Sequence, residues 1–286
     1  MKLIIGVIMV IGCTIGGYVA LGGKVGVLWQ PFEVVIIVGS AIGAMIIAQP
    51  GSVLKKIGKG FGAAMKGSRY KQADYVELLC LLFSVFKLAK SKGMLALETH
   101  IENPEDSALF QQFPGFQKDH HAVVFLCDYL RMLTLGTENP HELETLIDEE
   151  LETHHAEYAR VSGAMQTMSD GMPALGIVAA VLGIIKTMGA ITEPPEVLGH
   201  LIGGALVGTF LGVWLSYGFI GPIASAMQAT FDDEHRYYVA IKAGLLAHLQ
   251  GYAPAVSVEF ARKALNSNVR PTFQEVEEAT GELQPV

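Results

Sequence analysis

A run of thirty-one residues, from Leu201 to Phe231, contains no Asp, Glu, Lys or Arg. About 20 apolar residues in a helix are enough to cross the hydrocarbon core of a bilayer. Small residues recur at every fourth position of this run and would form one ridge on a helix: Gly204, Gly208, Gly212 and Ser216. The run therefore predicts a membrane-spanning helix with a flat face for packing against protein. Any ion that passes it would need a carboxylate from elsewhere.

Three further apolar segments are long enough to span a membrane. Mean hydropathy is +0.39 and only 17% of the residues are charged, which indicates a membrane protein with a sizeable soluble part. The four predicted spans are Leu3–Gly23, Val34–Val53, Gly171–Ile191 and Leu201–Phe219. Lys186 is the one charged residue inside these spans, and its long side chain could reach the interface. Pro222 is expected to close the charge-free run.

Lysine and arginine are unevenly distributed around the spans. The Gly22–Glu33 connection carries only Lys24, and the Thr192–His200 connection carries none. Six basic residues follow the second span: Lys55, Lys56, Lys59, Lys66, Arg69 and Lys71. Because basic loops stay in the cytoplasm, both termini and the middle segment are predicted to be cytoplasmic. The same cluster indicates anchoring to anionic membrane lipid.

The predicted organisation is all-α, an integral membrane protein with four transmembrane helices. Residues 1–53 and 171–222 form two transmembrane hairpins. Residues 54–170 form a helical cytoplasmic domain between spans two and three, and residues 223–286 form cytoplasmic C-terminal helices with an acidic tail. No period-two alternation long enough for a sheet is present.

Local signals predict where helices of the middle segment begin and end. Asp74 with Glu77 resembles a capping box at a helix start. Gly93 and Gly136 are candidate helix stops. Two pairs place a capping residue before a proline and predict helix starts: Asn103-Pro104 and Asn139-Pro140. From His141 a helix could run on towards the membrane.

The sequence has no pattern typical of a catalytic site. The phosphate-binding loop G-x-x-x-x-G-K-[ST], the G-x-S-x-G elbow and H-E-x-x-H are absent. The adjacent pairs His120-His121 and His154-His155 do not share a helix face, which argues against metal binding. The net charge of −8 makes nucleic acid an unsuitable partner. We therefore expect no enzyme, no cofactor, no metal site and no nucleic-acid binding.

Several short segments resemble the MotA/PomA family of bacterial flagellar motor stator subunits, which is related to ExbB and TolQ. They occur in the expected order from the second span nearly to the C-terminus: 92–98 (KGMLALE), 101–104 (IENP), 148–152 (DEELE), 171–180 (GMPALGIVAA), 207–212 (VGTFLG), 217–222 (YGFIGP) and 251–254 (GYAP). The resemblance implies a stator subunit that converts proton flow into torque on the rotor.

The resemblance also implies partners. Five copies would surround two copies of a MotB-type single-span subunit in the bacterial inner membrane, and that subunit would supply the ion-binding aspartate. The glycine ridge and Thr209 would let the partner helix come close, with Thr209 facing the pore. Pro173 and Pro222 match prolines that couple ion flow to movement.

Two charged residues match positions that face the rotor protein FliG. They are Lys90, where the family commonly has arginine, and Glu98. Lysine keeps the charge but lacks the planar fork of arginine, which favours a point-charge contact.

Alternative functions differ in the ion and in the driven machine. Sodium-driven relatives carry threonine where this chain has Ala180, and the methyl group removes one possible oxygen ligand. Ala180 therefore favours protons over a sodium-driven PomA-like stator. An ExbB/TolQ-type energy transducer is a second alternative, although such relatives typically have three spans. A third alternative is a scaffold without ion flow, in which the glycines only hold helices together.

Overall fold

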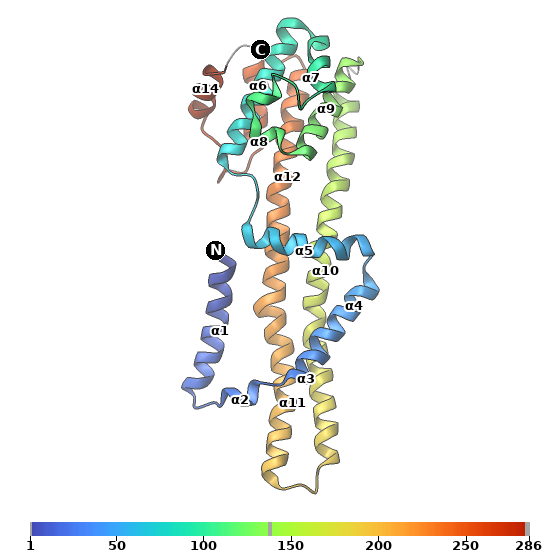
Figure 1. Cartoon of the computed structure of the whole chain (residues 1–286), viewed down its shortest axis with the longest axis vertical. Helices are drawn as coiled ribbons and strands as arrows, with labels where there is room; N and C mark the ends of the chain where they lie inside the picture. The colour runs from blue at the N-terminus through green and yellow to red at the C-terminus, as the bar shows by residue number, and fades with distance from the viewer. Residues whose placement is uncertain (1, 137–138, 284–286) are drawn as a thin grey trace. The chain divides into compact units, whose positions relative to one another are not determined.

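The computed structural model describes residues 2–136 and 139–283, and every regular element within these residues is a helix (Figure 1). The chain divides into two compact units. Unit 1 comprises Met1–Gly67 and Ala156–Phe231, and unit 2 comprises Ser68–His155 and Asp232–Val286. Two long helices, α10 (Pro140–Gly189) and α12 (Gly221–Leu249), contribute residues to both units. The all-α prediction is confirmed.

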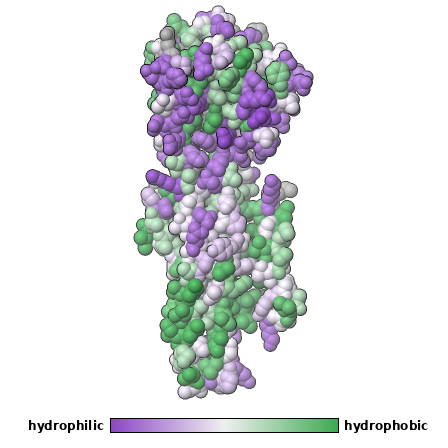
Figure 2. All heavy atoms as spheres, turned by 180° about the vertical axis from the view of Figure 1, so that it is seen from behind, coloured by the Kyte–Doolittle hydropathy of each residue, from purple (hydrophilic) through white to green (hydrophobic). Residues whose placement is uncertain are grey.

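Unit 1 contains the apolar helices. Besides parts of α10 and α12, it consists of α1 (Lys2–Ala20), α2 (Val25–Leu28), α3 (Pro31–Val34), α4 (Ser40–Ala48), α5 (Gly51–Lys66) and α11 (Pro195–Leu215). Four stretches are long and apolar enough to cross a membrane: Lys2–Ala20, Val25–Ala48, and parts of Pro140–Gly189 and Pro195–Leu249. Figure 2 shows hydrophobic residues covering much of this unit on the visible face. The prediction of four spans is therefore confirmed.

The second span differs from the predicted Val34–Val53 at both ends. Its helix ends at Ala48, since Gln49 and Pro50 have extended backbone, and α5 begins at the next residue, Gly51. A proline disfavours helical geometry in the preceding residue, which explains the break. Val53 thus belongs to α5. At the other end, the apolar stretch begins at Val25 and contains Glu33, so Lys186 is not the only charged residue within the spans.

Pro222 does not end the helix that contains the charge-free run, contrary to the prediction. A π-helical turn, Ser216–Ile220, joins α11 directly to α12, and Pro222 is the second residue of α12. The Gly221 N–H donates to the carbonyl of Ser216, five residues earlier, which is the π-helical pattern. The wider turn accommodates the proline, so the helix continues as far as Leu249.

Unit 2 is a helical domain with its own core. It consists of α6 (Gln72–Lys92), α7 (Glu98–Glu102), α8 (Pro114–Gln117), α9 (His120–Thr134), α13 (Pro254–Lys263) and α14 (Phe273–Gly281), together with parts of α10 and α12. The leucine-rich face of α6 is buried at the centre. Tyr70 stacks on Tyr237 with ring centroids 3.8 Å apart.

Three of the helix boundaries predicted in this region are confirmed. Gly93 and Gly136 follow the ends of α6 and α9 with φ of 86° and 94°, a left-handed conformation that favours glycine. Pro140 is the first residue of α10, and Asn139 accepts a hydrogen bond from the His141 N–H.

Two other boundary predictions are wrong. No helix begins at Pro104, because its carbonyl and that of Glu105 accept hydrogen bonds from the Gln117 side chain. Asp74 does cap α6, but it is the third residue of the helix and not its N-cap. Its carboxylate accepts a hydrogen bond of 2.7 Å from the backbone N–H of the N-cap residue, Lys71. Glu77 instead accepts hydrogen bonds from backbone N–H groups of α8.

Candidate functional site

The backbones of α10 and α11 touch at glycines. A Cβ atom added to Gly212 would lie 2.7 Å from both the Cα of Gly176 and the carbonyl oxygen of Met172. A Cβ added to Gly176 would lie 2.9 Å from the carbonyl oxygen of Gly208. These distances leave no room for any side chain. Gly208 and Gly212 of the ridge thus pack against α10 of the same chain, and Gly204 faces Gln30. The prediction that the ridge is open for a partner helix is wrong.

A carboxylate reaches this contact from α3. A Cβ added to Gly208 would lie 3.2 Å from the Ala180 nitrogen and 3.1 Å from Oε2 of Glu33. That oxygen is buried and has no hydrogen-bond partner within the described chain. Ala180 is buried and Thr209, which follows Gly208, is half-buried. The structure thus brings Ala180, the Thr209 turn and Glu33 together.

Glu33 is the residue that sequence reasoning missed in this part of the molecule. The hydropathy pattern predicts a second span that begins at Val34, which leaves Glu33 in a connection outside the membrane.

Pro173 removes a hydrogen bond that a serine on the neighbouring helix replaces. Proline has no N–H, so the carbonyl of Ser169, four residues earlier in α10, loses its helical donor. The Ser216 hydroxyl donates to that carbonyl at 2.7 Å, and the Ser169 hydroxyl lies 3.1 Å from the carbonyl of Ser216. Both serines are almost completely buried. This reciprocal pair, the Ser169–Ser216 clasp, joins the helix of Pro173 to the π-helical turn before Pro222.

Lys90 and Glu98 lie in unit 2, on an exposed corner. Lys90 is in the last turn of α6, and Glu98 is the first residue of α7. Both side chains are exposed, and Gly93 makes the turn between their helices. The arrangement presents one positive and one negative charge to solvent.

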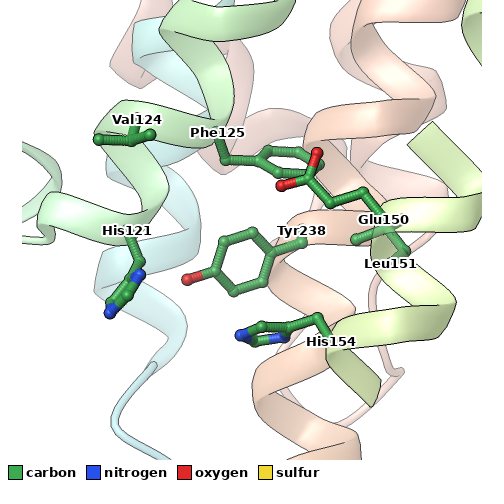
Figure 3. Close-up of a pocket in the computed structure, with 7 residues that line it drawn as sticks. All are labelled: His121, Val124, Phe125, Glu150, Leu151, His154 and Tyr238. Atoms are coloured by element: carbon green, nitrogen blue, oxygen red, sulfur yellow. The ribbon is translucent and has the colours of Figure 1, made fainter. Parts of the chain in front are cut away.

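Unit 2 also contains a small cavity of about 100 Å³ between α9, α10 and α12 (Figure 3). His121, Glu150, His154 and Tyr238 contribute its polar groups, and Glu150 also accepts a hydrogen bond from the Tyr129 hydroxyl. Pockets for small-molecule ligands measure roughly 300–1,000 Å³, so this cavity is too small to hold one. Among the described residues, no three His, Cys, Asp or Glu side chains are placed to hold a metal ion.

Comparison with known proteins assigns the family. A family described as Motility protein A N-terminal matches residues 4–93, and the MotA/TolQ/ExbB proton channel family matches residues 117–239. Motility protein A of Escherichia coli (strain K12) is 40% identical over 278 residues, covering 97% of this chain and 94% of that protein. The chain belongs to the MotA family. The resemblance seen in the sequence is thereby confirmed.

Solved structures agree with the MotA fold. The chain is similar to a chain of the C. jejuni MotAB structure with a TM-score of 0.77 and 18% identity, covering 93% of this chain and 96% of that one. It is similar to a chain of the flagellar MotAB stator complex from Bacillus subtilis with a TM-score of 0.72 and 26% identity, covering 90% and 92%. In this MotA chain, Pro173 and Ala180 lie on α10 and Thr209 lies on α11, whereas Lys90 and Glu98 lie in unit 2.

Proposed function

We propose that this MotA-family chain is a flagellar motor stator subunit. With a MotB-type partner it forms a proton channel and converts proton flow into torque. The identity of 40% to Motility protein A over nearly the whole chain carries this conclusion. The solved relatives are MotAB complexes, which supports a MotB-type partner and an oligomer. A motor of this kind is an ion channel and transducer, and we assign it no enzymatic reaction.

Finer features of the assembly follow from the family and from the charge distribution. We assign five copies around two partner chains, the bacterial inner membrane, cytoplasmic termini and cytoplasmic segments 54–170 and 223–286. The exposed charges of Lys90 and Glu98 would face FliG. The six basic residues after the second span support the orientation.

The glycine contact suggests where movement occurs. Because the α10 and α11 backbones touch at Gly176 and Gly212, that hairpin moves as one body. Bending is easier near Pro173 and Pro222, where a proline or a π-helical turn interrupts the regular hydrogen bonding. Since α10 and α12 run on into unit 2, a tilt at these points changes the position of the rotor-facing charges.

The energy available is sufficient for such a change. A proton that crosses the membrane releases about 2.3 kcal/mol per 100 mV. A shift of one pKa unit corresponds to about 1.36 kcal/mol. Protonation of the partner's aspartate can therefore bias two packings of the spans. Pro173, Ala180, Thr209 and Pro222 are our candidates for the pathway and its coupling.

The first alternative function, an ExbB/TolQ-type transducer, is supported by only one of the two family matches. The MotA/TolQ/ExbB proton channel family, which matches residues 117–239, is named for both kinds of protein, but the match over residues 4–93 is to a Motility protein A family. That second match covers the first two spans and α6, which supports the stator.

The choice of ion is tested by swimming. In a strain whose stator genes are deleted, this chain with its partner should restore swimming, and speed should not change when sodium is removed at constant proton-motive force. The reason is that Ala180 offers no side-chain oxygen to a sodium ion. A sodium-driven stator in the same strain, which should stop, is the control. Arrest of the complemented strain without sodium would overturn the assignment of protons.

Rotor contact is tested by charge reversal. Glu98→Lys should lower motor torque several-fold, because a like-charge contact opposes docking at the rotor. Membrane content of the chain and its co-purification with the partner should not change, since Glu98 is exposed. Glu105→Lys, an equally exposed change in the same unit, should keep torque near normal. If the two variants behave alike in tethered-cell rotation, Glu98 has no special contact with the rotor.

A further inference from the structure

Helix α5 has a face that packs against the rest of unit 1. Val53 is 7% exposed, and a Cβ added to Gly60 would meet Met227 Cε at 2.5 Å and Phe231 Cζ at 3.2 Å. Ile57 packs against the same cluster. Residues 53, 57 and 60 share one side of a helix. This side fixes α5 across α10 and α12 (Figure 1).

A second side of α5 is apolar but only partly covered. Leu54, Phe61 and Met65 lie about a quarter-turn round the helix from the packed side. Phe61 is 42% exposed, and Leu54 and Met65 are half-buried. An isolated exposed apolar side chain needs no explanation, but a stripe along a basic helix indicates a surrounding that is partly apolar.

The third side of α5 is basic. Lys55, Lys59 and Lys66 are exposed, and none of them makes an ion pair within the described residues. Lys56 lies on a different side of the helix and does form an ion pair, since its ammonium lies 2.7 Å from Glu157 Oε2. Three unpaired positive charges in one stripe therefore face outwards.

The contacts of α5 place it at the edge of the membrane. Met227 and Phe231 lie in the last turns of the charge-free run, and Asp232 and Asp233 follow directly. A helix leaves the hydrocarbon region where charged residues begin. Figure 1 shows α5 crossing α10 and α12 at this level. From the place where charged residues begin, we infer that α5 runs along the membrane surface.

We propose that the outer surface of α5 binds anionic phospholipid. Leu54, Phe61 and Met65 contact the acyl chains near the headgroups, and Lys55, Lys59 and Lys66 contact the phosphates. Apolar burial alone would accept any lipid, whereas the three unpaired lysines favour an anionic headgroup. An acidic protein partner could satisfy the lysines, but it would leave the apolar stripe unexplained.

The test uses the full chain co-purified with its partner and placed in vesicles of phosphatidylcholine with a minority of phosphatidylglycerol. Phe61→Trp provides a reporter, and the signal of the parent protein is subtracted. Bromine on one lipid or the other quenches tryptophan that it touches. We expect brominated phosphatidylglycerol to quench more than its share of the lipid predicts. Equal quenching per molecule by both lipids, or no quenching by either, would overturn the proposal.

Charge removal then identifies the groups responsible. In the triple variant Lys55→Gln, Lys59→Gln, Lys66→Gln, the preference for phosphatidylglycerol should fall about fivefold per lysine removed. Quenching by brominated phosphatidylcholine should persist, because the apolar stripe is unchanged. The matched control changes three lysines of unit 2: Lys87→Gln, Lys118→Gln and Lys263→Gln.

If the triple variant does not fold, the Phe61→Trp protein with all its lysines intact can be titrated with salt instead. The preference should disappear as salt rises from about 0.1 M to 1 M, since the screening length shrinks from about 10 Å to 3 Å. A preference that survives both the lysine changes and high salt would show that these charges do not bind the lipid.

Discussion

Gly212→Ala should lower the thermal midpoint of the purified complex by several degrees and abolish swimming. The added Cβ would lie 2.7 Å from two backbone atoms of α10, the Cα of Gly176 and the carbonyl oxygen of Met172, and backbone cannot move aside as a flexible side chain can. Overpacking of this kind costs about 1–3 kcal/mol. About 1 kcal/mol corresponds to roughly 2–4 °C in a chain of this size.

The matched control is Gly199→Ala on the same helix. A Cβ at Gly199 meets nothing within 4 Å, and alanine is a better helix former than glycine by about 0.5–1 kcal/mol. This variant should melt at the same temperature or slightly higher, and it should swim. Equal tolerance of alanine at both glycines would mean that the α10–α11 backbones do not touch.

Ser216→Ala should destabilise the protein by about 1–3 kcal/mol, the cost of a buried carbonyl without a donor. That carbonyl belongs to Ser169, whose helical donor Pro173 has removed. Ser169→Ala should cost less, because the Ser216 carbonyl still accepts from the Gly221 N–H. Thermal melting of the two variants measures the difference.

A second substitution distinguishes the Ser169–Ser216 clasp from a simple loss of packing. Pro173→Ala restores an N–H at residue 173, so adding it to Ser216→Ala should recover much of the lost stability. The exposed Ser225→Ala is the control and should have no effect. If the double variant is less stable than Ser216→Ala alone, the replaced hydrogen bond is not the reason for the loss.

Hydropathy was sufficient to predict the long spans, because a membrane imposes length and apolarity directly on the sequence. It failed at the second span, where Gln30, Pro31 and Glu33 interrupt the apolar pattern. The structure accommodates them by packing on α11, with Gln30 beside Gly204 and Glu33 beside Gly208. Such contacts depend on residues far away in the chain and leave no local pattern.

Short-range signals were most reliable where the backbone itself requires a residue type. Gly93 and Gly136 were read correctly because a positive φ favours glycine. The prediction for Glu77 fails because its carboxylate oxygen accepts hydrogen bonds from the backbone of α8 and not from the start of its own helix. The prediction for Pro222 fails because the helix continues through a π-helical turn just before the proline. The family was recognisable from the residues, whereas the Ser169–Ser216 clasp required coordinates.

Proton flux into vesicles tests most directly whether the ionisable group of the pathway belongs to the partner. Three preparations are compared at one membrane potential: this chain alone, this chain with its partner, and this chain with a partner whose membrane aspartate is replaced by asparagine. We predict flux only in the second preparation. Flux through this chain alone would contradict the account and would assign conduction to its own carboxylate, Glu33.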